Sequence, residues 1–280
     1  MFQVVWRDEE APQEFKDASI VLIYKKKGDR RDCGNYRSIS LLAIAGKILT
    51  RMLFSRLLKI VVNDALTEAQ CGCRSKRGTS DMSFAARQLQ EKCREQHRDL
   101  YTVFIDLTKA FDMVSRSGLW QLLRKFGCTE KFTKILKSLH EGMLGPVNIG
   151  GEFSEPFPVT NGVRQGCIAG PILFNLFYAA MLSEATRDLQ CGVFIRFQTT
   201  GKLFNLSRLR ASTKVFEQIL YELLYADNCA LEAHSVQDIQ LISNLVYLPS
   251  PHICGQNRRL LKKLISGRGR WFFEAFPPNL

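Results

Sequence analysis

The chain has 280 residues, of which 46% are hydrophobic and 24% are charged. This composition excludes an intrinsically disordered protein, and the length allows one large domain or two small ones. The formal net charge of +12 favours a nucleic-acid partner over a merely solvated surface, because the basic residues gather in clusters. The clusters are Lys25–Lys27 with Arg30 and Arg31, Arg74 with Lys76 and Arg77, and Arg258 and Arg259 with Lys262 and Lys263.

The nine cysteines predict neither a zinc site nor a disulfide framework. No two of them stand at C-x-x-C spacing, their number is odd, and no signal peptide opens the sequence. We therefore expect reduced thiols and a cytoplasmic or nuclear protein that is not secreted. No apolar run reaches the roughly 18 residues of a membrane span, so no membrane partner is expected.

Hydrophobic periodicity predicts the elements of the first third of the chain. Ser19–Tyr24 is a continuous apolar strand, and the basic, glycine-containing segment Lys25–Arg37 is a loop. Apolar residues at helical spacing predict a helix over Ile44–Val62. Thr79 or Ser80 would cap a further helix.

The middle of the chain alternates short strands and helices. Leu100–Ile105 is a buried strand that ends at Asp106, and helices follow at about Gly118–Phe126 and Glu130–Leu139. Glycines then punctuate a loop with short strands, up to the long apolar helix Ala169–Ala185.

The last third contains a predicted hairpin. Leu220–Tyr225 and Cys229–Ala233 are strands on either side of a tight turn at Ala226–Asn228, where Asp and Asn tolerate the backbone conformation. Gly192–Phe197 is a weaker strand before the hairpin, and Val236–Tyr247 is a helix after it.

Asp106 and Asp227 are the most informative pair of residues. Each carboxylate closes an apolar, strand-like run, and the two lie 121 positions apart, so only the fold can bring them together. Two carboxylates at adjoining strand ends suit a pair of divalent metal ions that catalyse phosphoryl transfer. Arg164–Pro171, a glycine-rich turn that leads into an apolar helix, lies between them. This order of motifs indicates a polynucleotide polymerase.

Four sequence blocks carry a resemblance to a known family. In chain order they are Ile20–Asp29 with Asn35–Leu42, Phe104–Asp112, Asn161–Cys167 with Pro171–Phe174, and Tyr225–Asn228. Together they resemble the reverse transcriptase domain of a non-LTR, LINE-type retrotransposon. The similarity runs from about Phe15 to Tyr247 and is specific because the blocks occur in order and at the family's spacing.

The resemblance implies an α+β, right-hand polymerase fold. Residues 1–99 and 119–160 would form the fingers, and residues 100–118 and 161–248 would form the palm. Residues 249–280 have four prolines and no sustained period, so we expect a divergent, poorly ordered tail. No thumb motifs are recognisable in this tail, as expected of a truncated or frameshifted copy of such an element.

The implied activity is that of an RNA-directed DNA polymerase, a nucleotidyltransferase. It would add deoxynucleotides from deoxynucleoside triphosphates to a DNA primer on an RNA template, with two Mg²⁺ ions as cofactors. Asp106 matches the aspartate of the family's first catalytic motif, and Asp227 matches the first aspartate of its Tyr-x-Asp-Asp turn. Both are candidate catalytic residues and metal ligands. The alternative interpretations are a strand-end cap for Asp106 and an ordinary turn residue for Asp227.

Asn228 departs from the family pattern, which has a second aspartate at this catalytic position. Asn keeps the size and the turn preference but lacks a negative charge beside a dication. That charge is worth on the order of several kcal/mol at an effective dielectric constant of about 20. We therefore expect an impaired enzyme, and the alternative is a non-catalytic, nucleic-acid-binding relic of a retrotransposon.

Three residues match positions that contact the incoming nucleotide in the family. Phe111 resembles a steric gate against the ribose 2′-hydroxyl, although it could equally be a core phenylalanine. Gln165 would contact the nucleotide, and Gly166 would allow close approach of the backbone. The alternative for the last two is an ordinary loop before a helix.

Lys25, Lys26 and Arg37 are candidate contacts to the triphosphate. A basic strand and loop suits a polyanion that must arrive and leave, and a solvated loop is the alternative. Gln70–Arg74 resembles a segment that contacts the template strand.

Overall fold

The computed structural model describes residues 1–57, 66, 69–72, 74, 76–107, 109–164, 166–197, 216–247, 262–267 and 270–275. The chain divides into two compact units. The first contains Met1–Thr67, Lys109–Met181 and Ser250–Asn257, and the second contains Glu68–Thr108, Leu182–Pro249 and Arg258–Leu280. These boundaries differ from the predicted fingers and palm. Residues 68–99, predicted as fingers, belong to the unit of Asp106, and residues 109–118 and 161–181, predicted as palm, belong to the other unit.

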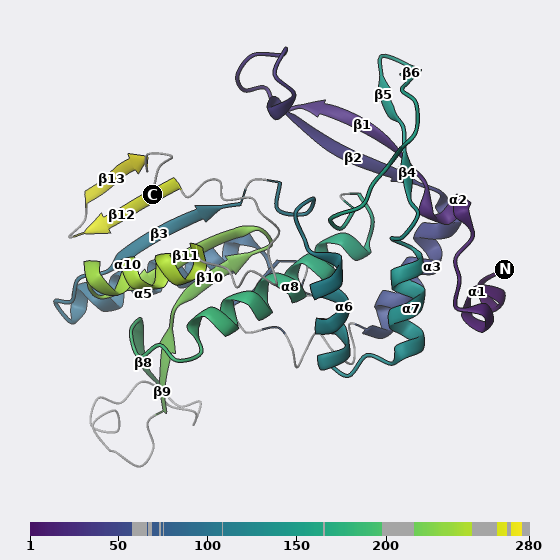
Figure 1. Cartoon of the computed structure of the whole chain (residues 1–280). Helices are drawn as coiled ribbons and strands as arrows, with labels where there is room; N and C mark the ends of the chain where they lie inside the picture. Colours follow the sequence, from purple (N-terminus) through teal and green to yellow (C-terminus); the bar gives the residue numbers. More distant parts are fainter. Residues whose placement is uncertain are drawn as a thin grey trace. The chain divides into compact units, whose positions relative to one another are not determined.

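A four-stranded sheet with the order β2-β1-β5-β6 organises the first unit (Figure 1). Strand β1 (Ala18–Tyr24) pairs antiparallel with β2 (Tyr36–Leu42) and parallel with β5 (Val147–Ile149), which pairs with β6 (Glu152–Phe153). Strands β4 (Leu144–Gly145) and β7 (Phe157–Pro158), which precede β5 and follow β6 in the chain, form a separate short antiparallel pair. The prediction for β1 is confirmed.

The predicted loop over Lys25–Arg37 is too long at its end. Strand β2 begins at Tyr36, which pairs with Tyr24, and Arg37 pairs with Ile23. Beyond Arg37 the sequence alternates serines with apolar residues, which is the period of a strand. A 3₁₀ turn, η1 (Cys33–Asn35), leads into the strand.

Helices supply most of the core of the first unit. They are α1 (Phe2–Asp8), α2 (Gln13–Lys16), α3 (Ile44–Leu57), α6 (Arg116–Lys125), α7 (Glu130–Ser138) and α8 (Ala169–Thr186), whose residues up to Met181 belong to this unit. The predictions for α6, α7 and α8 are confirmed to within two residues at each end. The predicted helix over Ile44–Val62 is confirmed to Leu57, and its last five residues lie outside the described part. The largest fully buried side chains of these helices include Phe54, Leu119, Leu123, Ile135, Leu136, Leu173 and Leu176.

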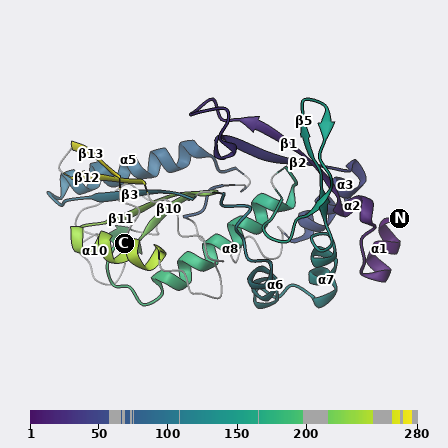
Figure 2. The ribbon, with the colours of Figure 1, turned by 45° about the horizontal axis from the view of Figure 1, so that its top comes forward.

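A three-stranded antiparallel sheet with the order β10-β11-β3 organises the second unit. Its strands are β10 (Glu222–Tyr225), β11 (Asn228–Ala233) and β3 (Tyr101–Asp106). Helix α5 (Thr79–Glu95) covers one face and helix α10 (Val236–Tyr247) covers the other (Figure 2). Leu223 and Ala230 pack with α5, and the next residue along each strand faces the opposite way.

Helix α5 begins at Thr79, which is one residue earlier than a Thr79 cap would allow and two earlier than a Ser80 cap would allow. The N-cap is Gly78, whose backbone N–H donates to the Asp81 carboxylate at 2.6 Å. The capping group is therefore the acidic residue in the first turn, which also suits the positive end of the helix dipole.

The remaining strands of the second unit form two separate pairs. Strand β8 (Val193–Phe197) pairs with β9 (Phe216–Leu220), and β12 (Lys262–Gly267) pairs with β13 (Arg270–Ala275). The last pair corrects the expectation of a poorly ordered tail for these twelve residues, where aromatic and aliphatic residues favour a strand. Within the described part of the chain, no helix is long and apolar enough to cross a membrane.

Candidate active site at the β10–β11 turn

The register of the second unit's sheet brings the two predicted catalytic segments together. Asp106 is the last residue of β3, and its Cα partner is Asn228, the first residue of β11. Directly opposed residues of an antiparallel pair have Cα atoms about 4.5–5.5 Å apart, and Asp227 is one residue, about 3.8 Å, further along. The Cα atoms of Asp106 and Asp227 therefore lie within about 9 Å, although the residues are 121 positions apart in the sequence.

The turn between β10 and β11 has one residue in an unusual backbone conformation. Ala226 takes the left-handed conformation, with φ of 53°, and neither Asp227 nor Asn228 has a positive φ. This conformation is unfavourable by about 1–2 kcal/mol for a residue with a Cβ atom. The predicted hairpin with a tight turn is confirmed. Its left-handed residue is Ala226, so a contact to Ala226 must hold the turn.

That contact comes from Gln70, whose side chain is completely buried. Its Oε1 atom accepts a hydrogen bond from the Ala226 N–H at 3.0 Å, and its Nε2 atom donates to the Ala226 carbonyl at 3.4 Å. Sequence reasoning placed Gln70 only in a segment that contacts the template. The signal that it missed is the glycine two residues later, since Gly72 allows a close backbone approach.

Two further carboxyl groups are buried in the same sheet. Burial raises the pKa of Glu232 to about 8, although a hydrogen bond from the Thr102 hydroxyl at 2.6 Å acts in the opposite direction. Burial alone raises the pKa of Glu222 to about 7. Both residues are buried. Glu222 lies on β10, which leads into the turn, and Glu232 lies on β11, which leads out of it.

Phe111 packs inside the first unit. Its ring centroid lies 4.8 Å from that of Phe174, which stacks on Tyr178 at 5.5 Å. Phe111 is half-buried, and its ring packs against helix α8 through Phe174. The core role of Phe111 is thus present, and its role as a steric gate remains a prediction.

Gly166 makes a close approach within its own unit. Its φ is +101°, and a Cβ atom there would lie 2.6 Å from the carbonyl oxygen of Ser40 on β2. The glycine is therefore required by the turn itself, whatever else it contacts. Gln165 lies outside the described residues.

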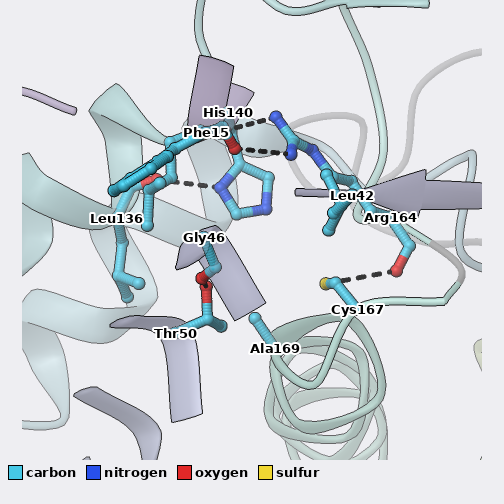
Figure 3. Close-up of a pocket in the computed structure, with 10 residues that line it drawn as sticks. Phe15, Leu42, Gly46, Thr50, Leu136, His140, Arg164, Cys167 and Ala169 are labelled. Atoms are coloured by element: carbon cyan, nitrogen blue, oxygen red, sulfur yellow. Dashed lines mark hydrogen bonds between the residues drawn. The ribbon is translucent and has the colours of Figure 1, made fainter. Parts of the chain in front are cut away.

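Arg164, in contrast, points into the first unit (Figure 3). Its guanidinium donates to the carbonyls of Leu139 at 2.5 Å and Phe15 at 3.3 Å, and only 6% of the residue is exposed. Burial lowers its pKa to about 10. Neighbouring His140 is also buried, with a pKa lowered by burial to about 3, and its Nδ1 atom contacts the Leu136 carbonyl. Arg164 therefore completes the end of helix α7 and does not form part of a nucleotide-binding surface.

The three predicted triphosphate contacts lie on the β1–β2 hairpin of the first unit and are exposed. Lys25 donates from Nζ to the Gly34 carbonyl at 3.0 Å, and Lys26 has a positive φ of 55°. Arg37 lies on β2. The loop is ordered by its own contacts, including the Tyr24–Tyr36 ring pair at 5.4 Å, so the basic side chains are displayed on a defined scaffold.

A family model described as "Reverse transcriptase (RNA-dependent DNA polymerase)" matches residues 24–197. This chain belongs to the reverse transcriptase family.

Its relatives confirm the predicted resemblance to reverse transcriptases of non-LTR retrotransposons. The chain is 30% identical to the RNA-directed DNA polymerase from mobile element jockey of Drosophila melanogaster, over 61% of its own length and 19% of the relative's. It is 27% identical to the probable RNA-directed DNA polymerase from transposon BS of the same species, over 83% of its length and 24% of the relative's. The chain therefore spans only about a fifth to a quarter of the length of these relatives.

Solved structures confirm the fold class. Apo telomerase from Candida tropicalis superposes with a TM-score of 0.53 at 13% identity, covering 84% of this chain and 47% of that one. The same organism's telomerase with a fragment of telomeric RNA gives a TM-score of 0.52. The chain has the predicted α+β, right-hand polymerase fold.

The residues at the turn suit a divalent metal ion, which reverse transcriptases use. Mg²⁺ binds proteins through one or two carboxylates together with substrate phosphates, and Asp106 and Asp227 match that set in kind and number. Asp227 is half-buried and Asn228 is exposed. Among the residues that the structure describes, no cluster of three or more His, Cys, Asp or Glu side chains offers a fuller metal site.

Proposed function

We propose that this chain is the nucleotide-adding part of an RNA-directed DNA polymerase. The observation that carries the proposal is the pairing of Asp106 with Asn228, which brings the end of β3 beside the turn that holds Asp227. The template would be RNA, the primer DNA, and the substrates deoxynucleoside triphosphates.

In this proposal Asp106 and Asp227 would hold two Mg²⁺ ions. When bound, such ions lower the pKa of the primer 3′-hydroxyl and neutralise the triphosphate and the leaving pyrophosphate. The protein's own contribution would be to bring one carboxylate from the end of β3 and one from the β10–β11 turn to these ions.

The other predicted residues would bind and orient the nucleotide. Exposed Lys25, Lys26 and Arg37 would attract the triphosphate, because clustered cations raise the local concentration of a polyanion. Phe111, which is half-buried, would lie under the sugar and exclude a 2′-hydroxyl by volume. Gln165 and Gly166 would lie against the new base pair.

Primer extension tests the proposal. Purified chain is incubated with an RNA template, a DNA primer, deoxynucleoside triphosphates and Mg²⁺. Extension that Asp106→Ala abolishes supports the polymerase. Ribonucleotide incorporation should rise in Phe111→Ala if that ring excludes the 2′-hydroxyl.

A second candidate function follows from Asn228, which supplies an amide where the family has an aspartate. The chain would then bind primer-template without turnover. If neither the wild type nor Asn228→Asp extends a primer, while both bind it in a salt-sensitive manner, the binding function replaces the catalytic one. The fold must first be verified by cooperative thermal unfolding, since an unstable product would bind and catalyse nothing.

A further inference from the structure

Residues 69–72 lie along the edge of strand β10, next to the turn that holds Asp227. Gln70 forms a parallel bridge with Leu224. The Cys71 N–H donates to the Leu224 carbonyl at 2.9 Å, and the Leu224 N–H donates to the Ala69 carbonyl at 2.9 Å. Residues 69–72 therefore extend the sheet by one short strand and reach the turn from the side opposite β11.

The amide of Gln70 matches the polar groups that the turn presents. Its Oε1 atom accepts from two backbone N–H groups, those of Ala226 at 3.0 Å and Gly72 at 2.8 Å. Its Nε2 atom donates to the Ala226 carbonyl at 3.4 Å. A carboxylate would lack the donor and an apolar side chain would satisfy neither group, whereas the amide serves both the N–H and the carbonyl of Ala226.

Gly72 completes the contact by letting the two backbones meet. A Cβ atom on residue 72 would lie 2.3 Å from the Ala226 nitrogen, which belongs to the backbone and cannot swing away. Any side chain at this position would therefore displace either the segment or the turn.

The turn needs such a restraint for a physical reason. Ala226 is held at a φ of 53°, which a residue with a side chain leaves unless its surroundings fix it. Asp227 follows Ala226 directly, so rotation of the Ala226 backbone would swing the Asp227 carboxylate relative to the end of β3. A metal site tolerates displacements of only about 0.5 Å.

We propose that Gln70, together with Gly72, is a positioning residue that fixes Ala226 and thereby orients the Asp227 carboxylate for metal binding. The proposal rests on the proposed function of Asp227 as a metal ligand. Gln70 itself is completely buried and acts through the turn, not by touching the nucleotide or the metal.

The test compares Gln70→Met with Thr102→Val. Methionine retains the length and flexibility of glutamine but removes its three hydrogen bonds. Thr102→Val removes one buried hydrogen bond, to Glu232, at the far end of the β3–β11 ladder, and controls for general loss of stability. Two quantities are measured in each variant: the exchange rate of the Ala226 amide proton by NMR, and the affinity for Mn²⁺ alone by titration. Asp106→Asn identifies the Mn²⁺ that binds at the carboxylate pair.

In Gln70→Met the Ala226 amide should exchange about tenfold faster or more than in Thr102→Val, after correction for global stability. The Asp106-dependent Mn²⁺ affinity should fall by about fivefold or more, and Thr102→Val should leave it unchanged. Gly72→Ala should produce both effects by displacement. An Ala226 amide that exchanges alike in the two variants overturns the restraint. Faster exchange with unchanged Mn²⁺ affinity overturns the positioning role.

The proposed function fails in a different way. If the wild type binds no Mn²⁺ that depends on Asp106, Asp227 is not part of a metal site and the positioning role falls with it. The amide exchange of Ala226 then still reports whether Gln70 restrains the turn.

Discussion

Asn228 stands directly across the sheet from Asp106, and this position has two opposite electrostatic consequences. An aspartate there would place like charges opposite each other and destabilise the strand pair when no cation is present. The same aspartate would strengthen the attraction for a dication. The Asn228 amide removes both effects. The stability of the strand pair therefore depends less on a bound metal ion, and the proposed metal site is weaker.

We predict that Asn228→Asp makes the stability of the chain depend on Mg²⁺. Without metal its Tm should be a few degrees below that of the wild type, because like charges at one strand end cost about 0.5–1 kcal/mol. Added Mg²⁺ should raise its Tm more than it raises the wild type's, since binding to the folded state stabilises by mass action. Differential scanning calorimetry with and without Mg²⁺ measures both shifts. Equal Mg²⁺ responses of the two proteins would contradict a metal site at this turn.

At the scale of elements, the β10-β11-β3 sheet is held by polar as well as apolar contacts. Glu232 on β11 and Thr102 on β3 are Cα partners and share a buried hydrogen bond of 2.6 Å. The pKa of Glu232 is raised by burial to about 8, so its neutral form is the one that fits the sheet. Since the folded state holds this proton to a higher pH than the unfolded state does, the unfolding free energy must fall as the pH rises between the two pKa values.

We predict that Glu232→Gln reduces this pH dependence. From the ordinary pKa of 4.5 up to about 8, the wild type should lose stability as the pH rises, by at most about 1.4 kcal/mol per pH unit from this carboxyl. Glutamine is neutral throughout and can still accept from Thr102, so its variant should be the more stable protein at pH 8. Urea unfolding at pH 6 and pH 8 measures the difference.

The matched control is Glu155→Gln, which changes an exposed carboxyl of the first unit and should leave the slope unchanged. Some pH dependence should persist in Glu232→Gln because burial also raises the pKa of Glu222, to about 7. Identical slopes for wild type and Glu232→Gln would mean that water reaches this carboxyl in solution.

At the scale of the whole molecule, charge is the property that matters for a polyanionic partner. The formal net charge is +12, and the β1–β2 hairpin displays exposed Lys25, Lys26 and Arg37. Other cations are neutralised locally. The Arg124 guanidinium, for example, donates to both oxygens of Glu130, at 2.9 and 3.0 Å.

We predict that the hairpin cations contribute to salt-sensitive binding of primer-template, whereas Arg124 does not. Removal of one cation that binds a phosphate should reduce the slope of log K against log salt by about 0.7–0.9. The triple variant of Lys25, Lys26 and Arg37 to alanine should therefore show a slope shallower by up to about 2–3. Fluorescence anisotropy across a salt series measures the slope, with Arg124→Ala as the control. Equal slopes would mean that the hairpin is solvated and not a binding surface.

The sequence alone determined most elements because their cause is local. The long apolar helix α8, the strand that ends at Asp106 and the hairpin around Asp227 all follow from periodicity over a few turns or residues. Strand β2 (Tyr36–Leu42) was not predicted at all, because a basic, glycine-containing segment precedes it and hides the alternation. The family could be inferred because four motifs occur in the expected order along the chain. That inference does not depend on how far apart the motifs lie in space.

Only the tertiary structure decided what each polar residue of those motifs contacts. Arg164 stands in a motif beside Gln165, yet it turns inward to the carbonyls of Leu139, at the end of α7, and Phe15. Gln70 lies in a segment expected to touch the template, yet it is buried against Ala226. A buried amide or guanidinium takes its partners from whichever backbone groups the fold leaves beside it, often more than a hundred residues away. No local pattern encodes those partners, because they exist only once the segments have come together.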